Sequence, residues 1–316
     1  MGNRLYMVVP CYNEEEVLEE TTKRLTLRFD ELIQEGKIAG DSKILYVNDG
    51  SKDQTWPIIA RLHEENKYVS GLNLSRNRGH QNAVLAGLMY AKDRADMAIS
   101  MDADLQDDVM AIDKMVEKYH EGFDIVYGVR NSRKKDTWFK KTTAEGFYKF
   151  MKWMGVDIVF NHADFRLMSK RSLEQLANYE EVNLFLRGIV PLIGYPSTNV
   201  YYERNERFAG ESKYPLKKML SFAFDGITSF SVKPIRMICT IGLLIFLVSI
   251  AMLIYSIVIH YIGKTVAGWS SLIVSIWALG GLQLFAIGIV GEYIGKVYLE
   301  VKERPRFIIQ DILDKE

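Results

Sequence analysis

The C-terminal third of the chain contains two long apolar runs, and they constrain the fold more than any other feature of the sequence. They span Met237–Ile259 and Leu272–Val290, and Lys264, in the segment that joins them, is the one charged residue between Met237 and Gly291. Each run is long enough to cross roughly 30 Å of hydrocarbon as a helix. The sequence therefore predicts two transmembrane helices. The alternative, a buried helical hairpin of a soluble protein, is disfavoured because two adjacent charge-free runs of this length are rare in such folds.

Basic residues flank this pair of runs on both sides. Lys233 and Arg236 precede it, and four more follow it: Lys296, Lys302, Arg304 and Arg306. The positive-inside rule then places both ends of the hairpin on the cytoplasmic side. The predicted division is a cytoplasmic catalytic domain over 1–213, an amphipathic interfacial helix over 214–232, a transmembrane hairpin over 233–293 and a cytoplasmic tail over 294–316.

The overall charge excludes one class of partner. The chain has 40 basic and 40 acidic side chains, so its formal net charge is zero and its pI is about 7.0. A balanced chain without a strongly basic surface is not expected to bind nucleic acid. The two apolar runs instead make the lipid bilayer an expected partner.

The N-terminal region alternates short β-branched runs with longer segments of helical periodicity. The expected strands are 5–9, 43–48, 69–74, 97–101 and 124–127, and the expected helices are 15–35, 55–65, 81–92 and 109–120. This alternation predicts an α/β fold with a parallel-rich, Rossmann-like sheet that is flanked by helices on both faces. Ligands of such sheets bind beyond the carboxyl ends of the strands.

Polar residues gather at those carboxyl ends. Asp102 and Asp104 follow the fourth expected strand, and Asp49 follows the second. Two carboxylates two residues apart are hard ligands suited to Mg²⁺ or Mn²⁺, and an ion held by so few ligands keeps positions open for phosphate oxygens. The pair suggests a nucleotide diphosphate; the alternative is a helix cap or a turn. Asp49 could bind a base or ribose, or form an Asx turn.

Two further segments have a recognisable pattern. Residues 130–141 are rich in Arg and Lys and are expected to form a loop. Residues 214–227 place apolar side chains on one helical stripe directly before the first apolar run, which is typical of a helix that lies in the membrane interface. Packing of this helix on the soluble core is the alternative.

Four motifs in this order resemble an inverting glycosyltransferase of family 2 with the GT-A fold. They are VVPCYNEE (8–15), VNDGSKDQT (47–55), NRGHQNA (77–83) and DADLQD (102–107). With DFRLMS (164–169), RFAGESKYPLKK (207–218) and the two C-terminal runs, the sequence is most similar to polyprenyl-phosphate glycosyltransferases. That group includes dolichyl-phosphate mannose synthases and bacterial bactoprenol glucosyltransferases of the GtrB type.

The resemblance implies roles for individual residues, carried over by position. Those that would line the nucleoside pocket are Pro10, Tyr12, Glu14 and Asp49, and His80 would lie near the donor. Asp102 would bind the donor phosphate through a metal ion, which Asp104 and Gln106 would ligate. Those that would meet donor or acceptor phosphates are Arg130, Arg133, Arg204, Arg207, Ser212 and Lys213. Among them Arg207 is a catalytic candidate, as is Asp104.

Asp164 and Arg187 each leave two interpretations open. The resemblance makes Asp164 the candidate base, whereas an ion pair with Arg166 or a strand-end cap would make it structural. Arg187 is either a phosphate ligand or a surface arginine on a helix. His80 replaces the Lys that mannose synthases carry in an N-x-G-K pattern, which disfavours GDP-mannose as the donor.

The resemblance predicts a membrane-bound, metal-dependent enzyme that transfers one sugar from a nucleotide sugar to undecaprenyl or another polyprenyl phosphate, with inversion. UDP-glucose is the expected donor, and UDP-N-acetylglucosamine and GDP-mannose are the alternatives. A processive polysaccharide synthase is disfavoured because the chain lacks a Q-x-x-R-W segment. The expected location is a bacterial-type inner membrane. Small residues in the second run, such as Gly280 and Gly288, would allow homo-oligomer contacts.

Overall fold

The computed structural model describes residues 2–130, 162–182, 184–203, 227–228, 231–262 and 268–314. Contacts between Cα atoms divide the chain into two compact units. The first comprises Met1–Glu145, Ile158–Tyr214 and Arg304–Glu316, and the second comprises Gly146–Asp157 and Pro215–Glu303. The basic segment expected to form a loop lies almost entirely outside the described residues, as does most of the expected interfacial helix.

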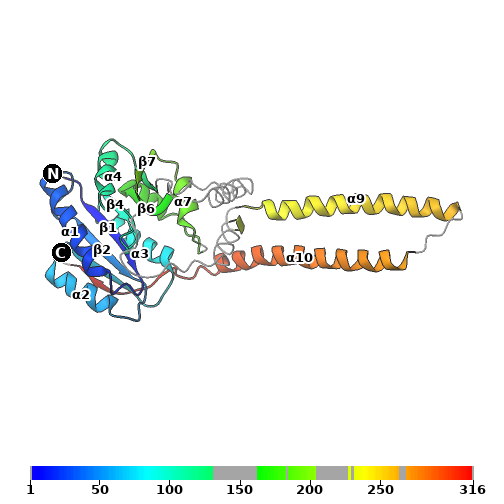
Figure 1. Ribbon diagram of the computed structural model, residues 1–316, viewed down its shortest axis with the longest axis horizontal. Helices are drawn as coiled ribbons and strands as arrows, with labels where there is room; N and C mark the ends of the chain where they lie inside the picture. Colours follow the sequence, from blue (N-terminus) through cyan, green and yellow to red (C-terminus); the bar gives the residue numbers. More distant parts are fainter. Residues whose placement is uncertain are drawn as a thin grey trace. The chain divides into compact units, whose positions relative to one another are not determined.

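The first unit contains one eight-stranded sheet, in the order β7-β5-β6-β4-β1-β2-β3-β8. Figure 1 shows this unit with five of the strands labelled: β1, β2, β4, β6 and β7. Its strands are β1 (Leu5–Cys11), β2 (Lys43–Asn48), β3 (Val69–Leu74), β4 (Met97–Ser100), β5 (Ile125–Arg130), β6 (His162–Ser169), β7 (Ser197–Tyr202) and β8 (Ile309–Leu313). Its helices are α1 (Leu18–Gln34), α2 (Thr55–Glu65), α3 (His80–Lys92), α4 (Ala111–His120), α6 (Lys170–Leu176) and α7 (Leu186–Leu192).

The predicted alternation of strands and helices is confirmed from β1 to β5. Strands β1 to β4 pair in parallel, as crossover helices require. The sheet is mixed because β6 runs antiparallel to both β4 and β5, and β8 runs antiparallel to β3. The antiparallel direction of β6 brings its amino end to the carboxyl end of β4, which matters for the candidate active site.

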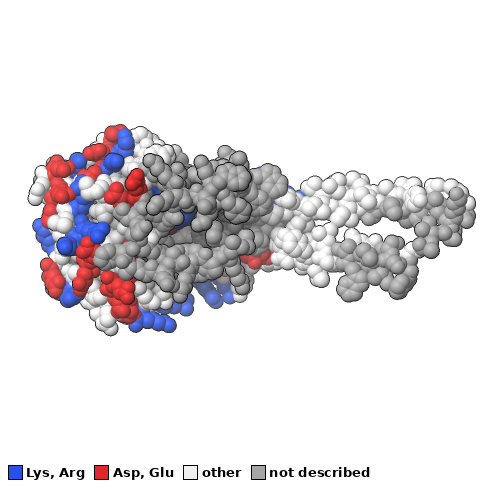
Figure 2. All heavy atoms as spheres, viewed as in Figure 1, with Lys and Arg blue, Asp and Glu red and all other residues white. Residues whose placement is uncertain are grey.

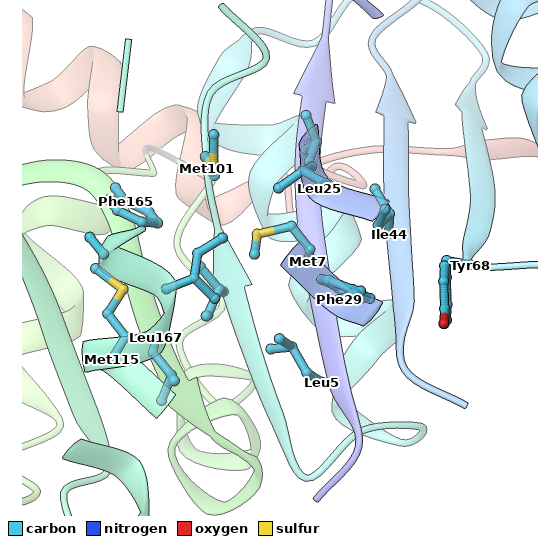
Figure 3. Close-up of a cluster of buried hydrophobic side chains, with 14 of the residues drawn as sticks. Leu5, Met7, Leu25, Phe29, Ile44, Tyr68, Met101, Met115, Phe165 and Leu167 are labelled. Carbon is cyan, nitrogen blue, oxygen red and sulfur yellow. The ribbon is translucent and has the colours of Figure 1, made fainter. Parts of the chain in front are cut away.

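Alternation of side chains along β1 explains how the sheet is covered. Leu5, Met7 and Val9 point to one face and join a buried cluster with Leu25 and Phe29 of α1 (Figure 3). The same cluster includes Met115 of α4 and Ile59 of α2, whereas α3 packs against β1, β2 and β4 from the other face. Burial of both faces accounts for the near-continuous hydrophobic character of these strands.

The C-terminal residues return to the sheet, which the sequence-based division did not foresee. Strand β8 pairs with β3, so residues that were assigned to a separate tail form an edge of the first unit. Asp314 accepts hydrogen bonds from Ser70 Oγ at 3.0 Å and from Tyr90 Oη at 2.6 Å. The end of the chain is thereby fixed to β3 and α3.

The second unit contains α9 (Lys233–Tyr261) and α10 (Trp269–Val301), which contact each other as an antiparallel pair. The described side chains of this pair that are visible in Figure 2 are mostly uncharged, whereas Lys, Arg, Asp and Glu gather on the first unit. Helix α10 extends beyond the predicted end of the hairpin at 293. Within the described part of the chain, no helix combines the length and the apolar character that crossing a membrane requires, so the two predicted transmembrane helices are not confirmed.

Candidate active site

The candidate active site begins where β1 and β4 separate. Chain connections lead from β1 to β2 and β3 on one side, while β4 lies on the other, so this is the switch point of the sheet. Pairing of β1 with β4 ends at Val8 and Ser100. Pro10, the second residue after Val8, has no N–H with which to extend the ladder. The strands can therefore diverge here, and the loops that follow them lie at this edge of the sheet.

The loop after β1 is bonded to the loop after β2. Asn13 has a positive φ of 54° and donates its N–H to Ser51 Oγ at 3.0 Å, and its Oδ1 accepts the N–H of Lys52 at 3.0 Å. Glu14 donates its N–H to Thr55 Oγ1 at 2.9 Å. These bonds form one scaffold under the exposed Tyr12 ring. Tyr12 and Glu14, both predicted to line a nucleoside pocket, thus lie on a braced loop.

Asp49 holds the loop after β3. The carboxylate is 2% exposed and accepts the N–H groups of Arg78 at 2.7 Å and Gly79 at 2.9 Å. Burial raises the pKa of Asp49, although these two N–H groups and the nearby His80 oppose the shift. Asp49, which the resemblance places in the nucleoside pocket, therefore also fixes the backbone of the loop after β3.

Gly50 is required beside this contact for two reasons. Its φ of +64° is a conformation that residues with a side chain rarely adopt. A Cβ atom there would also lie 2.5 Å from the backbone nitrogen of Asn77 and 2.6 Å from the carbonyl carbon of Arg76. The loops after β2 and β3 can approach this closely only because a glycine stands at this position.

The DADLQD segment forms a tight turn after β4. Leu105 has a φ of 55°, and Asp104 Oδ1 accepts the N–H of Gln106 at 3.2 Å, so the side chain of Asp104 closes the turn around Leu105. Asp108 forms a second such turn just before α4, since its Oδ1 accepts the N–H of Met110, the residue that precedes the helix, at 2.9 Å. Gln106 is 8% exposed.

Asp102, the first residue of the DADLQD segment, lies beside His80. Its side chain is 35% exposed, and its Oδ1 lies 3.5 Å from His80 Nε2. Loss of hydration raises the pKa of Asp102 to about 6; His80 opposes the shift, and the carboxylates of Asp107, Asp164 and Asp104 add to it. The turn is therefore a site of concentrated negative charge that a cation would stabilise.

Asp164 faces the same histidine from β6. Its Oδ2 lies 3.5 Å from His80 Nε2, so the imidazole bridges the carboxylates of Asp102 and Asp164. Burial lowers the pKa of His80, but the hydrogen bond to Asp164 and the charge of Asp102 outweigh it, so the pKa of His80 is raised. Two carboxylates from different strands thus stabilise a protonated imidazole at the start of α3.

Two guanidinium groups hold Asp164. Arg187 of α7 donates from Nε to Oδ1 at 3.1 Å and from Nη2 to Oδ2 at 3.0 Å, and Arg166 Nη2 donates to Oδ1 at 2.8 Å. Burial opposes ionisation, but His80, Arg187 and Arg166 hold the pKa of Asp164 well below its usual range. The ion pair with Arg166 was one of the two interpretations of Asp164. Arg187, considered a possible surface residue, belongs to the cluster.

Arg130 lies in a neighbouring polar network. Its Nη2 donates to Asp107 Oδ1 and its Nε to Tyr202 Oη, each at 3.2 Å, and Tyr202 also donates to Asp107. Asp107 is 1% exposed. Charge neutralisation of this buried carboxylate is therefore one task of Arg130, which the resemblance assigns to phosphate binding. Tyr202 was not identified from the sequence.

Five predicted site residues cannot be located, because they lie outside the described residues: Arg133, Arg204, Arg207, Ser212 and Lys213. The described residues place Pro10, Tyr12, Glu14, Asp49, His80, Asp102, Asp104, Gln106 and Asp164 on the loops and strand ends of one sheet edge. Among the residues that the structure describes, no group of three or more His, Cys, Asp and Glu side chains is arranged to hold a metal ion.

Two family models match the chain. Glycosyl transferase family 2 matches residues 6–177, which include the loops after β1, β2, β3 and β4 and the amino end of β6. A second model, the GtrB C-terminal hairpin, matches residues 233–297, which contain α9 and much of α10. The chain therefore belongs to glycosyltransferase family 2, and the predicted resemblance is confirmed. The protein is a glycosyltransferase with a GT-A-like mixed α/β sheet.

Similar proteins match nearly the full chain. The uncharacterized glycosyltransferase YkoT of Bacillus subtilis (strain 168) is 60% identical over 305 residues, which cover 96% of this chain and 90% of YkoT. The bactoprenol glucosyl transferase of Shigella phage SfX is 40% identical over 312 residues, which cover 97% of this chain and 99% of that protein. The prophage bactoprenol glucosyl transferase homolog of Escherichia coli (strain K12) is 39% identical over 313 residues, or 98% and 99% of the two chains.

Proposed function

We propose that the protein transfers one glucose from UDP-glucose to the phosphate of undecaprenyl or another polyprenyl phosphate, with inversion at the anomeric carbon. The observation that carries this proposal is the cluster of Asp102, His80, Asp164 and Arg187 at the carboxyl edge of the sheet, where β1 and β4 separate. The bactoprenol glucosyl transferases that match nearly the whole chain support glucose as the sugar and a polyprenyl carrier as the acceptor.

A divalent cation, Mg²⁺ or Mn²⁺, is part of the proposal. The donor set fits such an ion, because Asp102 and Asp104 supply hard oxygen ligands. Burial is the main cause of the raised pKa of Asp102, and the nearby carboxylates that add to the rise would be neutralised in part by a bound cation. Two carboxylates, with Gln106 as a further candidate ligand, suffice where substrate phosphates complete the coordination. When bound, the ion would neutralise charge that develops on the leaving diphosphate.

The acceptor's own chemistry explains why Asp164 need not act as a base. A phosphate monoester has a second pKa of about 6, so the lipid phosphate is mostly dianionic at neutral pH. Its oxygen forms the new bond to the anomeric carbon as the bond to the donor diphosphate breaks, and no proton has to be removed. Asp164, held by Arg166 and Arg187, is a weak base and serves to orient Arg187 toward the phosphates.

The proposal places the protein in a bacterial-type plasma membrane, with the sheet unit in the cytoplasm and the segment 233–293 as a transmembrane hairpin. The two charge-free runs and the basic residues that flank them support this arrangement. The match to the GtrB C-terminal hairpin over 233–297 agrees with it. Residues 214–232 would then lie in the interface, close to the phosphate of the lipid acceptor.

The test is a transfer assay with the full-length protein in detergent. Undecaprenyl phosphate is incubated with UDP-glucose, UDP-N-acetylglucosamine, UDP-galactose or GDP-mannose, each labelled in the sugar, and label in the lipid extract is measured. We expect label from UDP-glucose, its loss in EDTA, and its return with Mg²⁺ or Mn²⁺. Label from another donor alone would overturn the choice of sugar, and no label from any donor would overturn the proposal.

A matched pair of variants tests the turn after β4. Asp104→Asn removes a proposed metal ligand, whereas Asp108→Asn changes a carboxylate four residues away whose observed contact is the N–H of Met110. Asparagine accepts a hydrogen bond from the backbone two residues on, as aspartate does. We expect Asp104→Asn to lose transfer while it still folds, and Asp108→Asn to retain it. Equal activity of the two variants would remove Asp104 from the proposed metal site.

A further inference from the structure

We propose that the C-terminal strand β8 positions the nucleotide-binding loops through a relay of hydrogen bonds that starts at Asp311. The relay passes from Asp311 to Asn73 on β3, to Asn48 at the end of β2, and to the backbone of Ser51. This inference rests on the proposed function, because it takes the loops after β1 and β2 as the donor-nucleotide site. Asp311 is a positioning residue and has no contact with substrate in this account.

The geometry of the relay is continuous. Asn73 Nδ2 donates to Asp311 Oδ2 at 2.9 Å, and Asn48 Nδ2 donates to Asn73 Oδ1 at 2.8 Å. The N–H of Ser51 then donates to Asn48 Oδ1 at 3.2 Å. Asn48 is 2% exposed, so its amide has little access to water that could replace a lost partner.

The carboxylate gives the relay its direction. An ionised carboxylate only accepts hydrogen bonds, so Asn73 must turn its NH₂ group toward Asp311 and its carbonyl oxygen toward Asn48. Asn48 must then present its own carbonyl oxygen to Ser51, where a backbone N–H needs an acceptor. Without a fixed acceptor at 311, the Asn73 amide can rotate by half a turn, which points its NH₂ group at the NH₂ group of Asn48. If the Asn48 amide then rotates as well, its NH₂ group faces the N–H of Ser51 and two donors meet there.

The relay ends at the loops that carry the predicted nucleoside residues. Ser51 Oγ accepts the N–H of Asn13, which is flanked by Tyr12 and Glu14. Asp49 follows Asn48 directly and holds the loop after β3. A change in the orientation of the Asn48 amide would therefore disturb the loop after β1, through Ser51, and the loop after β3, through Asp49.

Asp311 faces Asn73 at the end of a regular stretch of the β3–β8 ladder, directly beside a bulge in β8. Asn73 pairs with Asp311 and Leu74 with Ile309, so Gln310 is the extra residue of a bulge. Bulges of this kind redirect side chains and are common next to active sites. The strand is otherwise held by Asp314, which bonds Ser70 and Tyr90 near the opposite end of β3. Asp311 thus positions the loops, whereas Asp314 docks β8 on β3 and α3.

The experiment measures binding of UDP with Mn²⁺ to the full-length protein in detergent by titration calorimetry, together with KM and kcat for UDP-glucose. Asp311→Val removes the acceptor but keeps a residue that favours strands. We expect UDP to bind about fivefold more weakly and KM to rise by a similar factor, with kcat nearly unchanged, because one net hydrogen bond is lost. Asp311→Asn keeps a carbonyl acceptor and should stay close to the wild-type protein.

Asp314→Val is the matched control, since it removes a carboxylate from the same strand and lowers the melting temperature without touching the relay. Equal weakening of UDP binding by Asp311→Val and Asp314→Val would overturn the relay in favour of general strand docking. Wild-type affinity in Asp311→Val, or an Asp311→Asn variant as weak as Asp311→Val, would also overturn it. Wild-type protein that binds neither UDP nor GDP would instead refute the proposed function.

Discussion

Replacing Asp164 by Asn tests the electrostatic balance of the candidate site. Arg166 is 1% exposed and donates to Asp164 Oδ1 at 2.8 Å. Removing one member of a buried ion pair leaves the other charge uncompensated, which lowers stability by about 3–5 kcal/mol. Asn retains one carbonyl acceptor, and the Arg187 side chain is 36% exposed and can be hydrated. We therefore expect the lower end of the range, a loss of about 3 kcal/mol in the free energy of unfolding.

The assay is urea-induced unfolding of the full-length protein in detergent, followed by far-UV circular dichroism. Arg187→Ala is the comparison, because its half-exposed guanidinium contributes about 1 kcal/mol or less. Replacing both buried partners, Asp164→Leu with Arg166→Met, should recover most of the loss, because the buried guanidinium is removed together with its carboxylate and the Arg187 side chain that remains is exposed enough to be hydrated. An Asp164→Asn variant as stable as the wild-type protein would refute the view that Arg166 depends on Asp164.

The remaining predictions concern other contacts of the first unit. Thermal unfolding should show that Gly50→Ala is less stable than Gly36→Ala by about 1–3 kcal/mol. Both glycines have a positive φ, but of the two only Gly50 has backbone atoms within 4 Å of the added Cβ, so an equal loss of stability in the two variants would refute the steric argument. The hydrogen bond from Arg171 holds the pKa of Asp124 below its usual range. Ionised Asp124 therefore stabilises the fold fully above the unfolded-state pKa of about 4, and this stabilisation is lost as the pH falls through the lower pKa of the folded state. Asp124→Asn should therefore lower the free energy of unfolding by about 1 kcal/mol at neutral pH. As the pH is lowered, the free energy of unfolding of this variant should fall less steeply than that of the wild-type protein, and an equal fall in both proteins would contradict this explanation. Asp102→Ala should abolish transfer and also the binding of Mn²⁺ measured with UDP present, and Mn²⁺ binding equal to the wild-type protein would exclude Asp102 as a ligand.

The local sequence pattern was enough to predict the part of the fold in which each strand is followed directly by a helix. The expected strands and helices from Leu5 to Tyr127 occur in the structure because their apolar periodicity and turn residues are set by near neighbours. Strand β8 has no such signal. Residues 309–313 form a strand because β3 offers an unpaired edge, and that partner lies more than 200 positions earlier in the chain.

The same limit explains why the sequence motifs indicated some site residues, missed Tyr202 and left the role of Arg187 open. Asp49, Asp102 and His80 occur in motifs that directly follow strands of the parallel sheet, so the carboxyl-edge rule was enough to group them. Tyr202 and Arg187 reach the polar clusters from β7 and α7, whose places depend on the antiparallel course of β6. A strand pattern alone does not reveal that direction.

The contacts of Arg187 explain why a carboxylate stands at a position where the proposed reaction needs no base. Its Nε and Nη2 atoms bind the two oxygens of Asp164 side-on, and no contact recorded among the described residues uses Nη1. This geometry fixes the plane of the guanidinium, and in the proposed function its other edge would bind a phosphate oxygen of a substrate. His80 and Arg166 also lower the pKa of Asp164, so the charge of this carboxylate does not depend on Arg187 alone. A neutral side chain at this position would leave Arg166 uncompensated. The same ion pairs that lower the pKa of Asp164 and make it a poor base therefore also orient Arg187.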